Sequence, residues 1–133
     1  MEFKPTIIFV VEDDDDDYML INDAFLELDP AVTVSRFVSC KELMDYTDLH
    51  QSPLPSLFIL DMSRYLEENV DCLRAIKQSD QLNDIPVYIY STSDYVPYVN
   101  EAIALGAARY IPKPVMYEKI KEVMEQLLHD VQK

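Results

Sequence analysis

The sequence predicts an α/β protein in which five parallel strands form one doubly wound sheet with helices on both faces. Apolar runs and amphipathic stretches alternate five times along the chain, as they do in successive βα units. The runs Leu57–Leu60 and Val87–Tyr90 are continuously apolar or aromatic, which is typical of strands covered on both sides. With 133 residues, 49% of them hydrophobic, the chain is expected to form a single domain, residues 1–133.

The strands are expected in a definite order across the sheet. Their predicted ranges are residues 6–11, 32–37, 57–61, 86–91 and 108–112. The first, third and fourth are apolar without interruption and should be central, whereas Val32–Arg36 alternates like an edge strand. The order 2-1-3-4-5 then places strands one and three side by side, at the point where ligands bind in such sheets.

The helices are predicted from apolar spacing and from capping signals. Helical spacing is kept by Ile21, Ala24, Phe25 and Leu28 in a stretch from Tyr18 to Leu28, and by Ile120, Val123, Met124, Leu127 and Val131 in the last helix. Ser39 and Glu42 form a capping box, so the second helix should begin near Cys40. Gly106, the only glycine, should end the fourth helix in a left-handed conformation.

Charge and composition argue against several functions. Lys and Arg total 11 against 25 Asp and Glu, and this net charge of −14 repels the phosphates of nucleic acids. The N-terminal residues lack a signal-peptide layout, and no apolar run approaches the roughly 20 residues of a membrane span, so a cytoplasmic location is expected. Cys40 and Cys72 match no metal or redox motif and are expected to be free thiols.

The acidic run Glu12–Asp17 follows the first predicted strand directly. Asp61, Ser91 and Lys113 stand at the ends of three other strands, and the ends of parallel strands meet at one rim. The first two carboxylates of the run and Asp61 would then share a site, and a divalent cation such as Mg²⁺ would offset their repulsion. A hydroxyl and an ammonium nearby suit phosphoryl transfer, with Asp61 as the nucleophile.

These motifs resemble the receiver domains of two-component response regulators, over nearly the whole chain. The matching segments, in the family's order and spacing, are Val10–Asp14, Leu57–Met62, Pro86–Thr92 and Ala104–Pro114. The resemblance implies a CheY-like, flavodoxin-like fold. It also implies a signalling domain that takes a phosphoryl group from a sensor histidine kinase or phosphotransfer protein, with catalysis confined to its own aspartate.

The resemblance assigns a role to each site residue. Glu12, Asp13, Asp61 and the backbone carbonyl of Ser63 would bind Mg²⁺, Asp61 would be phosphorylated, Ser91 would bond the phosphoryl group and Lys113 would pair with it. Ser91 and Tyr110 would act as the switch, altering the surface made by the fourth helix, fifth strand and fifth helix. Tyr95, Tyr98 and Tyr117 are expected on that surface, for a downstream protein or a homodimer.

Other interpretations of the same residues stay open. Asp14–Asp17 suit a helix cap and first-turn acids better than a metal site. Arg64–Val70 replaces the Pro-Gly-x-x-Gly loop that the family usually has after the phosphorylated aspartate, which would favour a degenerate receiver that binds partners without phosphorylation. A third alternative, a Mg²⁺-dependent phosphatase or phosphotransferase acting on an external substrate, lacks a second acid at Ser63.

Overall fold

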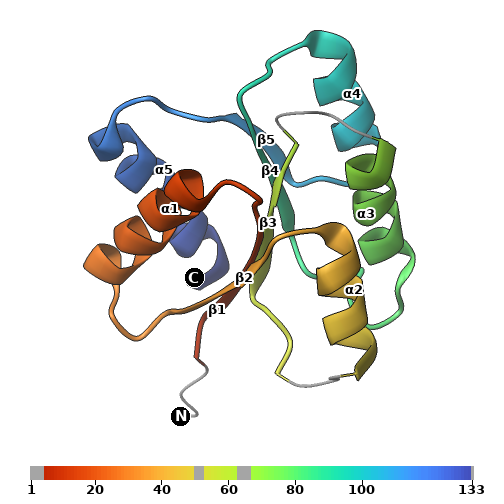
Figure 1. Ribbon diagram of the computed structural model, residues 1–133, viewed down its shortest axis with the longest axis horizontal. Helices are drawn as coiled ribbons and strands as arrows, with labels where there is room; N and C mark the ends of the chain where they lie inside the picture. The colour runs from red at the N-terminus through yellow and green to blue at the C-terminus, as the bar shows by residue number, and fades with distance from the viewer. Residues whose placement is uncertain (1–4, 50–52, 63–66, 133) are drawn as a thin grey trace.

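Five parallel strands form one sheet, in the order β2-β1-β3-β4-β5, in the computed structural model (Figure 1). The strands are β1 (Ile7–Val11), β2 (Thr33–Phe37), β3 (Leu57–Asp61), β4 (Val87–Ser91) and β5 (Arg109–Pro112). Each lies within one residue of its predicted range, and the predicted sheet order is confirmed. The structure describes residues 5–49, 53–62 and 67–132, with only the backbone of residues 67 and 68.

Helices cover both faces of the sheet, as Figure 1 shows. One face carries α1 (Asp15–Leu28) and α5 (Tyr117–Gln132), and the other carries α2 (Cys40–Leu49), α3 (Glu67–Gln78) and α4 (Val96–Ala104). The central strands β3 and β4 are therefore buried on both faces. Strand β2 is partly exposed, as expected at the edge of a sheet. Within the described residues, no helix combines the length and apolar character needed to cross a bilayer.

The acidic run extends α1 toward the N-terminus. Asp14 caps the helix, because its carboxylate accepts a hydrogen bond from the backbone N–H of Asp17 at 2.8 Å. Asp15–Asp17 form the first turn, where unpaired amides favour negative charge. The helix thus begins before Tyr18, and the interpretation of these four acids as a cap and a first turn is confirmed.

Two other helix ends follow their sequence signals. Ser39 Oγ accepts the N–H of Glu42 at 3.2 Å, and α2 begins at the next residue after the serine. Gly106 follows α4 with φ at +109°, and its N–H donates to the carbonyl of Ile103 at 3.0 Å. Glycine adopts this backbone readily because it has no Cβ, which explains why it stands here.

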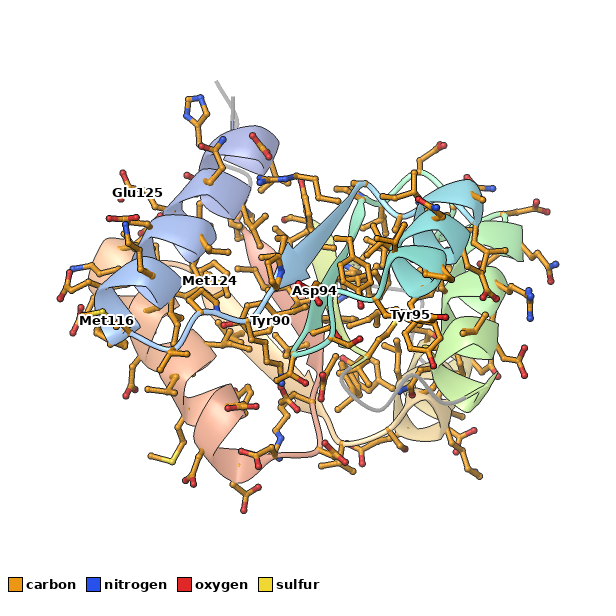
Figure 2. The ribbon with its side chains drawn as sticks, turned by 90° about the horizontal axis from the view of Figure 1, so that it is seen from above. Tyr90, Asp94, Tyr95, Met116, Met124 and Glu125 are labelled. Carbon is orange, nitrogen blue, oxygen red and sulfur yellow. A yellow bond between two sulfur atoms is a disulfide. The ribbon has the colours of Figure 1, made fainter. Side chains whose placement is uncertain are left out.

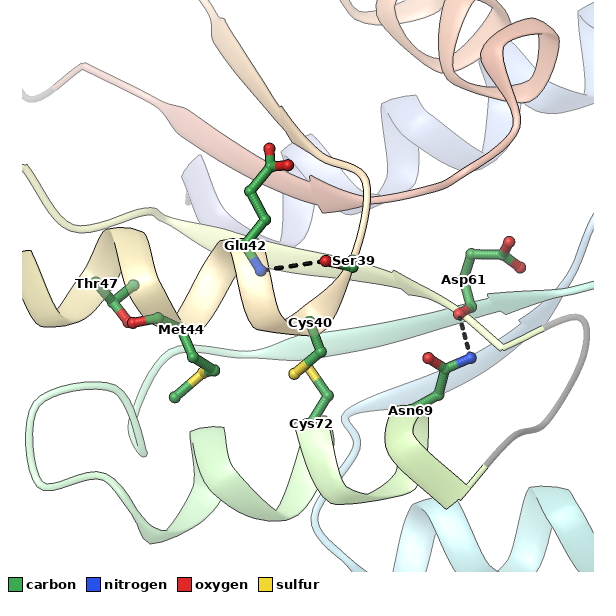
Figure 3. The surroundings of a disulfide bond; sticks show 8 residues. All are labelled: Ser39, Cys40, Glu42, Met44, Thr47, Asp61, Asn69 and Cys72. Atoms are coloured by element: carbon green, nitrogen blue, oxygen red, sulfur yellow. Dashed lines mark hydrogen bonds between the residues drawn. A yellow bond between two sulfur atoms is a disulfide. The ribbon is translucent and has the colours of Figure 1, made fainter.

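Cys40 and Cys72 form a disulfide bond, so the expectation of free thiols is wrong (Figure 3). Their Cα atoms lie 5.6 Å apart, although 32 positions separate them in the sequence. Cys40 opens α2 and Cys72 lies in the second turn of α3, and the two helices pack over the same face of the sheet. Helix packing creates this proximity, and cysteine spacing alone does not reveal it.

Candidate functional site

Three carboxylates lie together at the carboxyl ends of β1 and β3, which are neighbours in the sheet. Glu12 directly follows β1, and Asp61 is the last residue of β3. One oxygen each from Glu12, Asp13 and Asp61 lies within 4.8 Å of the other two. The structure thus brings together the three side chains that the sequence analysis assigned to one rim.

The backbone fixes Glu12 at this rim. Its N–H donates to the carbonyl of Phe37 at 3.0 Å, and its own carbonyl accepts from Arg36 Nε at 3.0 Å. The side chain of Glu12 is buried, that of Asp61 is half-buried and that of Asp13 is exposed. The cluster therefore extends from the protein interior to solvent, and a ligand can reach it from outside.

Lys113 supplies the positive charge of the site. Its Nζ lies 2.9 Å from Glu12 Oε1, 2.7 Å from Asp17 Oδ2 and 3.3 Å from Asp61 Oδ1. The backbone N–H of Lys113 donates a hydrogen bond to the carbonyl of Ser91 at 2.8 Å. This bond holds the Lys113 backbone beside the end of β4. One largely buried ammonium therefore contacts three carboxylates.

Burial raises the pKa of Glu12 to about 8, with a further contribution from the hydrogen bond it shares with Asp61, while Lys113 opposes the shift. Burial lowers the pKa of Lys113, but hydrogen bonds to Asp17 and Glu12 and the charge of Asp61 outweigh it, so the pKa lies above its ordinary value. The protein therefore favours the protonated form of Glu12 and the charged form of Lys113.

The carboxylate cluster fits a divalent cation of the Mg²⁺ type. Mg²⁺ prefers oxygen ligands at about 2.1 Å, so opposite ligands lie about 4.2 Å apart. The ligand oxygens of Glu12, Asp13 and Asp61 lie within 4.8 Å of one another, close to this spacing. Ser63, whose carbonyl the resemblance adds to the metal ligands, lies outside the described residues.

Ser91 and Tyr110 are joined through Ser93. Ser91 ends β4, is fully buried, and accepts the N–H of Ser93 on its Oγ at 3.1 Å. The hydroxyl of Tyr110 donates to the carbonyl of Ser93 at 2.7 Å. The sequence analysis did not single out Ser93, because its contribution comes from backbone groups that any residue type carries.

The three tyrosines expected on one interaction surface occupy two places. Tyr95 immediately precedes α4, is 56% exposed, and its ring centroid lies 4.7 Å from that of Tyr98. Tyr117 begins α5 and lines a groove with side chains of α1. Figure 2 shows Tyr95 beside α4 and Met116, the neighbour of Tyr117, on the other side of the sheet. Only Tyr95 and Tyr98 lie together.

Asp17 is a site residue that the sequence analysis missed. The sequence predicts it only as a first-turn acid, yet its carboxylate is the oxygen partner closest to Lys113 Nζ, at 2.7 Å. The two residues lie 96 positions apart, and they meet because α1 rises from the same rim of the sheet. A signal was present in the sequence, since Asp17 stands six positions beyond the end of the first strand, in the first turn of the helix that follows.

The doubly wound sheet, with an acidic cluster and a lysine at its carboxyl rim, has the arrangement that the resemblance to receiver domains implies. The chain belongs to the response regulator receiver domain family, whose sequence model matches residues 8–125. This confirms the resemblance seen in the sequence motifs. Receivers are signalling domains rather than classical enzymes, bind Mg²⁺ at an acidic pocket, and interact with histidine kinases or phosphotransfer proteins and with downstream targets.

Curated relatives come from archaea and bacteria as well as plants. The probable methanogenesis regulatory protein FilR2 of Methanothrix harundinacea is 30% identical over 126 residues, covering 92% of this chain and 81% of the relative. The probable C4-dicarboxylate response regulator DctR of Priestia megaterium is 25% identical over 126 residues, covering 95% of this chain and 53% of that protein. The chain thus spans most of one relative and about half of the other.

Solved structures share the fold at lower sequence identity. The phosphorylated cyanobacterial phytochrome response regulator RcpA has a TM-score of 0.87 and 23% identity, covering 98% of this chain and 96% of that one. The Mn²⁺-bound form of response regulator Rcp1 has a TM-score of 0.81 and 22% identity, covering 93% and 92%. These matches establish the receiver fold of the chain.

Proposed function

We propose that this chain is a stand-alone, cytoplasmic response regulator that accepts a phosphoryl group on Asp61 and signals through protein contacts. The observation that carries the proposal is the position of Asp61, within reach of two further carboxylates and 3.3 Å from the ammonium of Lys113. A nucleophilic carboxylate, a cation site and a fixed positive charge are the groups that phosphoryl transfer needs.

In the proposed reaction, an oxygen of Asp61 attacks the phosphorus of a phosphohistidine on the kinase or phosphotransfer protein. The phosphorus–nitrogen bond breaks, an acyl phosphate forms on Asp61, and the leaving imidazole takes up a proton. Lys113 pairs with the phosphoryl oxygens, and the hydroxyl of Ser91 donates to one of them. Mg²⁺, held by Glu12, Asp13 and Asp61, neutralises phosphoryl charge when bound.

The output is proposed to pass through Ser93. Engagement of the Ser91 hydroxyl by the phosphoryl group would withdraw it from the N–H of Ser93, which it now accepts at 3.1 Å. Because Tyr110 is bonded to the carbonyl of the same residue, the change reaches β5 and the start of α4. Tyr95 and Tyr98, beside one another at this place, are proposed to contact a downstream protein or a second copy of the chain.

The forms in which two similar proteins were solved support the proposed chemistry. RcpA was solved phosphorylated and Rcp1 was solved with Mn²⁺. Both properties belong to those proteins. Phosphorylation and divalent metal binding are therefore the first activities to test on this chain.

The test is incubation with Mg²⁺ and a small phosphodonor such as acetyl phosphate, followed by intact-mass measurement. The parent should gain the mass of one phosphoryl group, stable in acid and labile in base, whereas Asp61→Asn and a parent sample with EDTA should not. Because Asp61→Asn is nearly isosteric, circular dichroism should show it folded. A folded parent that gains no mass contradicts the proposal and favours the degenerate receiver, and sustained hydrolysis of a generic phosphomonoester would favour the phosphatase.

A further inference from the structure

The Cys40–Cys72 bond lies beside the phosphoacceptor rather than at a remote place in the fold. Both cysteines line a groove of about 430 Å³, whose wall also includes Asp13, Asp61 and Asn69. Figure 3 shows the bond between α2 and α3, with Asn69 of α3 bonded to the backbone of Asp61 at the end of β3. A change in the bond therefore alters the wall of the groove that contains the candidate metal ligands.

The bond joins two segments that are each attached to the acidic site. The segment before α2 is attached through Phe37, whose carbonyl accepts the N–H of Glu12 at 3.0 Å. Helix α3 is attached through Asn69, whose side-chain amide donates to the backbone carbonyl of Asp61 at 3.5 Å. Because β1 pairs directly with β3, the disulfide closes these contacts into a ring that includes both Glu12 and Asp61. It thereby restrains α2 against α3, the two helices whose cysteines line the groove that also contains Asp13 and Asp61.

The two cysteines differ in their exposure to solvent. Cys72 is 2% exposed, whereas Cys40 is half-buried and is the first residue of α2, where unpaired amides stabilise a thiolate. An incoming thiol therefore reaches Cys40 first. A bond with one accessible sulfur suits reversible exchange, and disulfides in a reducing compartment are usually transient or regulatory.

We propose that Cys40 and Cys72 form a redox modification site that controls metal binding, and through it phosphorylation, at Asp61. The reductant is a thiol of the glutathione or thioredoxin class. Its thiolate attacks Cys40 Sγ, the Cys40–Cys72 bond breaks, and Cys72 leaves as a thiolate that takes up a proton. A second thiol then releases Cys40 as a thiol, so two electrons and two protons enter the protein and the two donor thiols become a disulfide.

The bridged form holds α2 and α3, which are joined to the backbone of the metal ligands through Phe37 and Asn69, in place before the ion arrives, so it is the form with the higher metal affinity. The effect on phosphorylation rests on the proposed function, but the effect on metal affinity does not. We expect the bridged protein to bind Mg²⁺ about threefold more tightly than the reduced protein, because preorganised ligands lose less freedom on binding. Phosphorylation by acetyl phosphate at sub-saturating Mg²⁺ should be faster by a similar factor.

The experiment compares the full chain after dithiothreitol with the chain after glutathione disulfide. Mass spectrometry after thiol alkylation counts the free thiols, and calorimetric titration with MgCl₂ gives the affinity of each form. Cys40→Ser and Cys72→Ala are the matched controls. Each removes the bond by a different change, and both should bind Mg²⁺ like the reduced parent under either treatment, with unchanged circular dichroism.

The outcomes separate the two proposals. Two alkylatable thiols after oxidation, or equal Mg²⁺ affinities of the two forms, would overturn the redox site. A difference that persists in both cysteine variants would overturn it too, because the cause would lie elsewhere. A redox-dependent Mg²⁺ affinity without phosphorylation in either form would support the redox site and contradict the proposed function alone.

Discussion

Lys113 lies closer to Asp17 than to Asp61. Its Nζ is 2.7 Å from the Asp17 carboxylate and 3.3 Å from that of the proposed phosphoacceptor. Asp17 thus competes for the ammonium that would pair with an incoming phosphoryl group. The half-exposed first turn of α1 places this competing charge within the site.

Asp17→Asn should accelerate phosphorylation, because Lys113 is released toward Asp61. We expect the phosphorylation rate to increase about two- to fivefold, which corresponds to the loss of an ion pair worth up to about 1 kcal/mol. The rate of mass increase with acetyl phosphate at saturating Mg²⁺ measures it. Asp16→Asn removes the same charge from the same turn and serves as the control. Equal rates in the two variants would show that the contact between Asp17 and Lys113 is irrelevant to transfer.

The stability of the metal-free protein should fall as pH rises toward 8, because the pKa of buried Glu12 is raised from 4.5 to about 8. Folding then favours the protonated carboxyl, so this contribution is fully present below pH 4.5 and is lost as pH rises through about 8. Glu12→Gln removes the titrating group and should flatten the dependence.

Urea unfolding in EDTA, from about pH 5 to about pH 9, measures this difference between parent and variant. The variant should be the more stable of the two at the alkaline end. Parallel pH profiles would contradict the assignment of the raised pKa to Glu12.

Much of this molecule could be predicted from local sequence. The strands are predictable from apolar runs and, for the second strand, from an alternating pattern, and the carboxyl ends of parallel strands bring Glu12, Asp13, Asp61 and Lys113 to one rim. Such predictions need only residue order and the geometry of a sheet. They need no knowledge of side-chain contacts.

The relationships that escaped prediction join residues on different helices or on a helix and the rim. Cys40 and Cys72 meet across two helices, and Asp17 meets Lys113 across 96 positions. Each contact depends on how a helix is rotated about its own axis and where it lies along the sheet. Apolar spacing sets which face of a helix is buried, but it does not fix which polar residues at its ends will touch.

Gly106→Ala should destabilise the protein by about 1–2 kcal/mol, the cost of a left-handed backbone in a residue with a Cβ. The glycine has φ at +109°, and an added Cβ would lie 3.3 Å from Lys77 Cγ and Cδ. Urea unfolding measures the change. Asn100→Ala, an exposed site within α4, should leave stability the same or slightly higher. If Gly106→Ala lowers the free energy of unfolding no more than Asn100→Ala does, this account of the helix end is contradicted.

Tyr110→Phe should weaken the coupling between Ser91 and the surface at the start of α4. The variant loses the 2.7 Å hydrogen bond from the tyrosine hydroxyl to the carbonyl of Ser93, worth about 1 kcal/mol. Phosphorylation should proceed as in the parent, while the phosphorylation-dependent change in amide hydrogen exchange over Ser93–Tyr98 should shrink. An undiminished change over that segment would exclude Tyr110 from the switch.

The central claim is that Asp61 is the residue that takes the phosphoryl group. Borohydride reduction tests it most directly, because an aspartyl phosphate is converted to homoserine while a free carboxylate is untouched. After treatment with Mg²⁺ and acetyl phosphate, peptide mass spectrometry should find homoserine at position 61, and only when Mg²⁺ is present. Homoserine at another aspartate, or none in a folded and Mg²⁺-loaded protein, would contradict the account.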